Sequence, residues 1–252
     1  NLARIKGFKR IDGLGKLSLQ YDFQRNNRLE FDIRRGEDRE KASLDLQLDT
    51  HTLLLDLNSP LTDALNLKVG VMGRFQNNFA DPDTGVRRLI PDYDKYDLGL
   101  YAIADYRLNN QWLLEAGGRF DYVYMDVFKF YRTSFWESRN YDQLFPEIVL
   151  EELENQILTN PQLNFYNTSG TLGATYTFDT DYKLYFNYSI ASRAPNPSEL
   201  FSEGLHHSAS RIELGDLRFN SEIGHKVSLT FQRDNDLFRF SISPYINTIS
   251  DF

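Results

Sequence analysis

Two adjacent histidines, His206 and His207, lie between two glutamates, Glu203 and Glu213. Imidazole and carboxylate groups suit zinc, ferric iron or an axial position on haem. Neighbouring residues of an extended segment point in opposite directions, so we do not expect both histidines to bind one ion. One imidazole is enough to hold a metal or a haem, and the alternative is a polar loop without a ligand. The residue types therefore predict a metal-binding or ligand-binding site at His206 or His207, with Glu203 and Glu213 beside it.

Other kinds of chemical site are not indicated by the sequence. No Ser/His/Asp grouping, phosphate-binding glycine loop or pair of catalytic carboxylates stands out, so we expect a protein that is not an enzyme and holds no cofactor. Residues 81–85 begin like a calcium loop but lack its later ligands, and we expect a turn there. Residues 146–158 carry apolar side chains at helical spacing after a proline, which predicts a short helix.

The histidine segment lies between two stretches in which apolar and polar residues alternate. In residues 182–190 the even positions are apolar or aromatic, and in residues 223–231 most of the odd positions are. A period of two predicts strands that have one apolar and one polar face. Pro195 and Pro197 cannot continue a central strand, so residues 193–217 are expected to form a long loop between the two strands.

The same arrangement recurs along most of the chain. Residues 1–15 show little pattern, and the apolar positions of residues 42–57 change from even to odd, which predicts a β-bulge at 49–52. Short connections alternate with long ones. We therefore predict an all-β fold, an antiparallel meander of about nine strands with its short turns at one end. The long loops at the other end are residues 25–40, 77–95, 125–165 and 193–217.

This loop asymmetry is typical of a transmembrane β-barrel. Aromatic residues of the apolar face form two groups, one near the short turns and one near the long loops, as in the interfacial girdles of such barrels. A soluble β-sandwich also has alternating strands, but its loops have a median of about 4–6 residues. We therefore expect the apolar face to contact lipid, with these leucines pointing outwards: Leu67, Leu100, Leu172, Leu184 and Leu229.

The composition excludes several classes of protein. A formal charge of -8 argues against a nucleic-acid partner, and the absence of cysteine excludes disulfides and thiolate metal sites. No apolar run approaches the roughly 20 residues of a membrane helix. A barrel remains possible because only every second residue of a barrel strand faces lipid.

Two stretches resemble the family of TonB-dependent outer-membrane receptors. The first is Ala191-Ser-Arg-Ala-Pro195 followed by Glu199-Leu-Phe, Gly204-Leu-His, Glu213-Leu-Gly-Asp and Glu222; the second is residues 21–32 followed by Arg34-Arg35. The family has a barrel of 22 strands and an N-terminal plug domain. The resemblance implies that residues 1–252 are one part of such a barrel, and that the plug domain and the remaining strands are absent.

The resemblance also implies a function. It is TonB-energised uptake of a scarce nutrient across the outer membrane of a Gram-negative bacterium, with membrane lipid, a plug domain and the TonB complex as partners. The ligand would be an iron–siderophore, haem or another metal complex such as zinc, and Arg193 is a further candidate ligand-binding residue because it could meet an anionic siderophore. The alternative is a passive pore, or an adhesive or structural barrel, built from the same strands.

Overall fold

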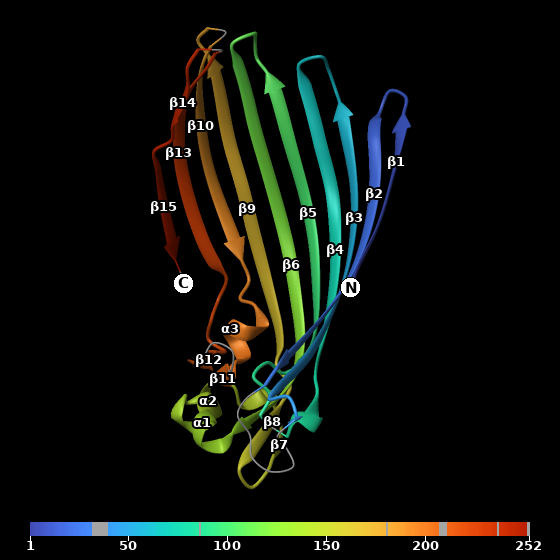
Figure 1. Cartoon of the computed structure of the whole chain (residues 1–252), viewed down its shortest axis with the longest axis vertical. Coiled ribbons are helices and arrows are strands. Elements are labelled where there is room, and N and C mark those ends of the chain that lie inside the picture. Colours follow the sequence, from blue (N-terminus) through green and yellow to red (C-terminus); the bar gives the residue numbers. More distant parts are fainter. Residues whose placement is uncertain (32–39, 86, 180, 207–210, 236, 251–252) are drawn as a thin grey trace.

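The computed structural model describes residues 1–31, 40–85, 87–179, 181–206, 211–235 and 237–250 of the 252-residue chain. Its main feature is one antiparallel wall of strands (Figure 1). The last strand, β15 (Tyr245–Ser250), pairs with β13 (Glu222–Asp234), as does β14 (Arg239–Ile242) just before it in the chain. The predicted all-β antiparallel meander is confirmed. The strands follow one another in the order β1 (Leu2–Ile11), β2 (Gly15–Glu30), β3 (Leu44–Pro60), β4 (Leu65–Ala80), β5 (Asp92–Arg107), β6 (Trp112–Arg132), β9 (Gln162–Thr177), β10 (Tyr182–Arg193), β13 (Glu222–Asp234) and β14 (Arg239–Ile242).

The wall includes β1, a strand that the apolar pattern does not indicate. Leu2, Ile5 and Phe8 are spaced by three residues, so Ile5 lies on the opposite face of an extended segment from Leu2 and Phe8, and no single apolar face results. Backbone pairing with β2 forms this strand instead, without a register shift from Leu2↔Gln24 to Ile11↔Gly15. Among the described residues β1 does not pair with β14 or β15, so the wall is open at both edges.

The two ends of the wall differ, as predicted from the lengths of the connections. Short turns join the strands at the upper end of Figure 1, and the longer segments fold against the lower end, which we call the loop end. Small elements make up these segments. They are η2 (Pro82–Thr84), α1 (Thr133–Ser138), α2 (Tyr141–Leu144), η3 (Pro146–Ile148), β7 (Val149–Glu152), β8 (Gln156–Thr159), α3 (Pro197–Phe201), β11 (Glu203–His206) and β12 (Arg211–Leu214).

Strand register assigns each side chain of the wall to one of two faces. Directly paired residues share a face, and one such row runs through Leu67, Ala104, Ala116, Leu172 and Tyr188. By the same parity all five leucines that we predict to point outwards lie on this face, which we call the outer face. Their contact with lipid stays a prediction. The opposite, inner face packs against the helices of the loop end, because Val123, Met125 and Val127 are buried there.

Aromatic residues lie at both ends of the apolar part of the outer face. Towards the loop end, neighbouring rings of Phe23, His51, Phe75, Tyr96 and Tyr124 have centroids 4.9–6.2 Å apart. A second aromatic group lies near the turns, where the rings of Trp112 and Tyr176 are 4.6 Å apart. From Tyr96 to Tyr106, β5 extends about 33 Å, which gives a height of about 25 Å at the usual tilt of barrel strands. This height equals the apolar band of about 25 Å in transmembrane barrels.

The row of residues beyond the aromatic group at the loop end is polar. Arg25 binds Asp49 through two hydrogen bonds of 2.6 and 2.7 Å, and the Asn77 amide donates to Asp94 at 2.8 Å. Both pairs lie on the outer face, since Asp49 pairs with Asn77 and Asn77 pairs with Asp94. The parts of the strands from this row towards the loop end therefore extend out of the apolar band.

The β-bulge predicted at residues 49–52 is wrong. β3 pairs with β2 from Leu44 to Asn58 and with β4 from Leu46 to Pro60 without a register shift. The apolar positions change parity because the environment of β3 changes along its length. Leu53 and Leu55 are exposed on the outer face of the apolar band. Leu44 and Leu46 lie beyond the band and are buried on the inner face with Ala80 and Leu89.

The helix predicted for residues 146–158 is also wrong. After the single 3-10 turn η3, this segment forms the hairpin of β7 and β8, and β8 pairs with the extension of β6. Ile157 and Thr159 are buried and alternate with partly exposed Leu158, so contacts with β6 override the helical spacing. In contrast, the turn predicted at residues 81–85 is confirmed: the Asp81 carboxylate caps η2, and Gly85 ends it with a φ of 64°.

The loop end has its own hydrophobic core. Trp136 from α1, Tyr141 from α2 and Phe201 from α3 are at most 1% exposed and pack on the inner face of β6. We call this cluster the loop core. None of the described helices is both long and apolar enough to cross a membrane. The loop core fixes α3 and the β11–β12 hairpin, which carry most of the predicted site residues.

Candidate functional site

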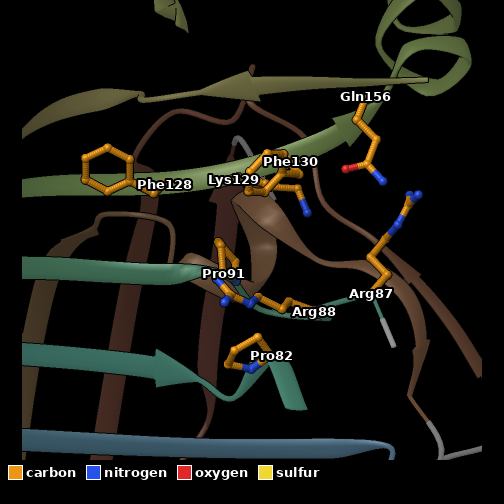
Figure 2. A pocket seen from close by; sticks show the side chains of 8 residues that line it. All are labelled: Pro82, Arg87, Arg88, Pro91, Phe128, Lys129, Phe130 and Gln156. Carbon is orange, nitrogen blue, oxygen red and sulfur yellow. The ribbon is translucent and has the colours of Figure 1, made fainter. Parts of the chain in front are cut away.

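Glu203, at the start of β11, lies in the centre of a cationic cluster. Its side chain is 1% exposed, and three basic groups surround it. The Arg87 guanidinium donates to Oε1, Arg132 Nε lies 3.4 Å from the same oxygen, and Lys129 Nζ lies 3.7 Å from Oε2. Figure 2 shows Arg87 and Lys129 projecting from two different segments towards the space between them.

Lys129 is almost completely buried in this cluster, with 2% of its side chain exposed. Burial lowers the pKa of Lys129 to about 8, because removal from water disfavours the charged ammonium group. Glu203 opposes this decrease, whereas the nearby charge of Arg87 adds to it. The cluster therefore holds buried positive charge that a single carboxylate does not balance.

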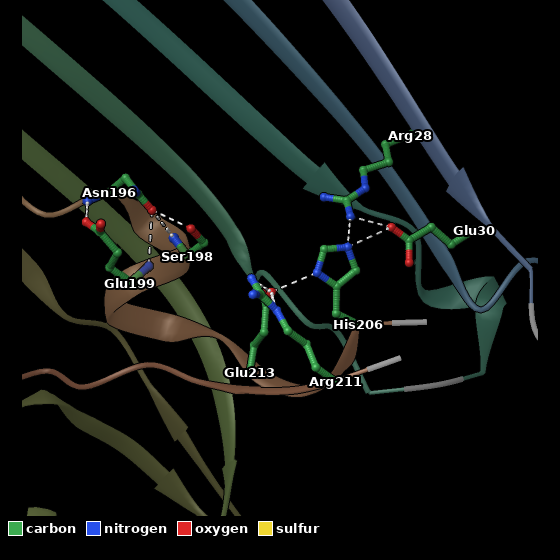
Figure 3. A network of polar contacts seen from close by, with 8 residues as sticks. All are labelled: Arg28, Glu30, Asn196, Ser198, Glu199, His206, Arg211 and Glu213. Carbon is green, nitrogen blue, oxygen red and sulfur yellow. Dashed lines mark hydrogen bonds and ion pairs between the residues drawn. The ribbon is translucent and has the colours of Figure 1, made fainter. Parts of the chain in front are cut away.

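His206, at the end of β11, joins the hairpin to β2 (Figure 3). Its Nδ1 lies 2.8 Å from Oε1 of Glu213, and its Nε2 lies 3.3 Å from Oε1 of Glu30 and also contacts the Arg28 guanidinium. Arg211 donates to Glu213 at 2.6 Å. The hydrogen bonds from His206 and Arg211 lower the pKa of Glu213, although partial burial opposes them.

The position of the two carboxylates limits what His206 can do as a ligand. Glu213 and Glu30 contact opposite nitrogens of the ring, so they do not converge on one point with the imidazole. Across the described ranges, no three His, Cys, Asp or Glu side chains are grouped so that they could hold a metal ion. A ligand that already carries its metal would need only one ring nitrogen. Both nitrogens of His206 are engaged, so such a ligand would have to displace Glu213 from Nδ1, or Glu30 and Arg28 from Nε2; 16% of the side chain is exposed.

Arg193, the last residue of β10, connects three segments. It donates to both carboxylate oxygens of Glu199 at 2.9 and 3.1 Å and to Glu222 of β13 at 2.7 Å. Burial alone would raise the pKa of Glu199, but the bonds from Arg193 and from the Asn196 amide together hold it below its ordinary value. Asn196 and Glu199 form a capping box that starts α3. Arg193 thus fixes the first turn of α3 against two strands.

Asp216, just after β12, anchors the end of the hairpin to α2. It accepts a hydrogen bond of 3.0 Å from the Tyr141 hydroxyl and one of 3.2 Å from Arg139. The Tyr141 hydroxyl accepts in turn from the Leu217 amide at 3.0 Å. Hydrogen bonds from Arg218 are the main cause that lowers the pKa of Asp216 to about 2.

The structure brings together only some of the predicted site residues. His206 contacts Glu213, as their types suggest, whereas Glu203 points to the cationic cluster and Arg193 to the base of α3. His207 lies outside the described residues. Whether any of these side chains binds a ligand stays a prediction.

Sequence reasoning missed most of the partners of these residues. Arg28 and Glu30 fall in a stretch predicted as a loop, but β2 continues to Glu30. The even positions of β2, such as Gln20 and Asp22, are polar, and extending this alternation would have placed Arg28 and Glu30 on the same inner face. No such signal exists for Arg87, which lies between two elements.

Comparison with known proteins gives a family and a fold. A family model described as TonB dependent receptor-like, beta-barrel, matches residues 7–252. None of the curated proteins compared with the sequence matches it.

Several solved structures are similar in fold. "Copper transporter OprC" superposes with a TM-score of 0.68 at 17% identity, over 100% of this chain and 39% of that one. The FrpB iron transporter from Neisseria meningitidis has a TM-score of 0.64 at 14% identity, over 98% of this chain and 36% of its own. The Serratia marcescens hemophore receptor HasR, solved with HasA and heme, has a TM-score of 0.62 at 14% identity, over 98% of this chain and 39% of its own. The chain thus spans less than two fifths of these proteins.

Proposed function

Because the chain belongs to the TonB-dependent receptor β-barrel family, we propose that it is part of an outer-membrane receptor that imports a scarce metal complex. The ligand class is a ferric siderophore, haem or another metal chelate. The structural neighbours support this class, since they include transporters of copper and iron and a receptor solved with heme. Family and neighbours are transport receptors rather than enzymes.

The observation that carries the proposal is the position of His206. The ring lies at the loop end, where the longer segments gather beyond the apolar band, and it contacts the wall through Glu30 and the hairpin through Glu213 (Figure 3). A metal complex that approaches from this end meets an imidazole held by carboxylates on two segments. Carboxylate partners orient a ligating imidazole and increase its basicity. We propose that His206 supplies a ligand atom to the metal complex, with His207 as the second candidate.

The remaining parts of the proposal concern the complete receptor. We expect the open edges of β1 and of β14 and β15 to pair with further strands of one barrel, because unpaired backbone groups in lipid cost several kcal/mol each. The partners are outer-membrane lipid, a plug domain and the TonB complex of a Gram-negative bacterium. Family membership supports these partners.

Uptake by the complete receptor in cells tests the proposal. Ferric siderophore, haem and zinc are supplied separately to cells with His206→Ala, His207→Ala or the double substitution. His225→Ala is the matched control, because His225 lies on the outer face and contacts the Tyr188 hydroxyl at 3.0 Å. We expect uptake of one of the three nutrients to decrease at least about tenfold with His206→Ala or the double substitution, the effect of losing one metal ligand or its oriented partner. The control should transport normally.

A second condition separates energised import from the alternative of a passive pore or structural barrel. Uptake through a TonB-dependent receptor stops when the TonB complex is deleted, whereas diffusion through a pore continues. Uptake that persists without TonB would refute the proposed function. If all histidine variants transport every nutrient normally, only the role of His206 and His207 is refuted.

A further inference from the structure

A pocket of about 380 Å³ lies beside the cationic cluster, between the segment that precedes β5 and the loop-end extension of β6 (Figure 2). Three cationic side chains, Arg87, Arg88 and Lys129, and the amide of Gln156 supply its polar lining. Two prolines and two phenylalanines complete the lining, and no carboxylate contributes to it. The pocket thus combines positive charge with apolar walls.

The charges around this pocket are not balanced among the described residues. Arg88 is paired with Asp92 at 2.5 Å, but Arg87, Lys129 and Arg132 share the single carboxylate of Glu203. Arg132 is 58% exposed and is therefore solvated, but Arg87 (29% exposed) and Lys129 (2% exposed) share one carboxylate, which leaves one positive charge in excess. Burying an uncompensated charge is costly, and an anion bound nearby would remove most of this cost.

The Glu203 carboxylate also has spare hydrogen-bonding capacity. Its Oε2 is buried and accepts no hydrogen bond from any described residue, because Lys129 is 3.7 Å away. Such buried polar atoms usually have a partner. Because Glu203 does not line the pocket, a ligand there would compensate the cations directly and would not reach this carboxylate.

Size and lining restrict the ligand class. Small-molecule sites typically have volumes of about 300–1,000 Å³, so this pocket is at the small end of the range. It is suited to one compact anionic group with a short carbon skeleton. We propose that the pocket binds the oxyanion of a compact organic ligand, a carboxylate or a phosphate, through Arg87 and Lys129.

Two sources could supply this oxyanion, a soluble molecule or the headgroup of a membrane lipid. Phe128 is four residues beyond Tyr124 of the aromatic row, which places the pocket about 10 Å beyond the apolar band at the usual strand tilt. Lipid headgroups occupy roughly the first 5–8 Å outside the hydrocarbon. The pocket thus lies just beyond the headgroup layer, which favours a soluble molecule, and the experiment separates the two sources.

The inference does not rest on the proposed function, because binding to the purified receptor is measured without transport. The complete receptor in zwitterionic detergent is titrated calorimetrically with citrate and with inorganic phosphate. In a parallel arm, receptor in phosphatidylcholine nanodiscs with or without lipid A, whose headgroup carries phosphates, is titrated with the same two anions. A soluble source gives citrate or phosphate binding in both formats. A lipid source gives binding that lipid A blocks.

Two substitutions test whether the anion binds in this pocket. Arg87→Gln should weaken binding by about tenfold or more, the effect of losing one charge-assisted hydrogen bond. The matched control is Arg139→Gln, because the Arg139 side chain is similarly exposed (28% against 29%) and also pairs with a buried acid, Asp216, outside the pocket. The control should bind the anion as the natural receptor does.

Lys129→Met removes the buried cation and should also weaken anion binding. If Lys129→Met does not fold, the result with Arg87→Gln alone tests the proposal. Absence of citrate and phosphate binding both in detergent and in nanodiscs would overturn the proposal. Equal losses in Arg87→Gln and Arg139→Gln would also overturn it, because they would reflect a general change at the loop end.

Discussion

Tyr141→Phe should open the loop core, whereas Tyr131→Phe should not. Both tyrosines are at most 2% exposed in the same cluster, and both substitutions remove only a hydroxyl group. The Tyr141 hydroxyl donates to Asp216 and accepts from the Leu217 amide, both at 3.0 Å. The Tyr131 hydroxyl has no hydrogen-bond partner among the described residues. The two variants therefore separate the hydrogen bonds from the volume of the side chain.

The magnitude follows from these contacts. The Tyr141 variant loses a hydrogen bond to a carboxylate, worth about 1.5–3 kcal/mol, and leaves a buried amide unpaired, which costs about 1–3 kcal/mol. Asp216 keeps its bonds from Arg139 and Arg218, so we expect about 2–4 kcal/mol in total. The loop core should then open about 30- to 700-fold more often. Removing the unpaired Tyr131 hydroxyl should be neutral or slightly stabilising.

Amide hydrogen exchange of the complete receptor measures this opening. The Leu217 amide is the direct reporter, since it is the group that loses its acceptor, and amides of α2 and α3 report on the rest of the loop core. The wall strands provide an internal reference and should exchange at the natural rate. Equal exchange in the two variants, or a change of less than about 0.5 kcal/mol with Tyr141→Phe, would show that the Tyr141 hydroxyl does not hold the loop core closed.

Three other predictions concern the lipid face, the buried lysine and the helix cap. Leu100→Arg on the outer face should destabilise folding into phospholipid vesicles by about 2–4 kcal/mol, and Asn187→Arg on the inner face should cost much less; equal shifts in the urea midpoint would contradict the assignment of faces. Burial lowers the pKa of Lys129 from 10.5 to about 8, so between pH 8 and 10.5 the unfolded loop end binds more protons than the folded one. The free energy of opening the loop end, measured by hydrogen exchange, should therefore increase with pH in this range by up to about 1.4 kcal/mol per pH unit. Lys129→Met should abolish this pH dependence. Asn196→Ala removes the N-cap of α3 and should destabilise this helix by about 1 kcal/mol, whereas Asn196→Asp should retain the cap. Equal protection of the α3 amides from hydrogen exchange in both variants would contradict this role of Asn196.

The wall could be predicted because its rule is local. Each strand needs only alternate apolar residues, and the length of each connection is visible directly in the sequence. The failures occur where contacts with another segment, and not the local pattern, decide the conformation. β1 exists through pairing with β2, and Leu44 and Leu46 are apolar on the inner face because Leu89, from another segment, covers them. The hairpin at 149–159 depends in the same way on β6.

The candidate site was predictable in its residue types but not in its contacts. His206 and Glu213 are close in sequence, so their contact could be suspected from spacing alone. Arg28 is 178 residues from His206, and Arg87 is 116 residues from Glu203. These contacts depend on how far β2 extends and on the path of the chain before β5. A sequence pattern of period two carries no information about either.

The anchors of α3 and the β11–β12 hairpin have a consequence for sequence variation. Glu199, Glu203 and Asp216 each bind a different part of the molecule, and these three carboxylates fix the path of the segment. Leu205 and Ile212 lie between the anchors and are 44% and 72% exposed. Substitutions at such positions change the exposed surface of the loop end without altering the backbone that supports it. The exposed residues can therefore vary freely while the three acids remain.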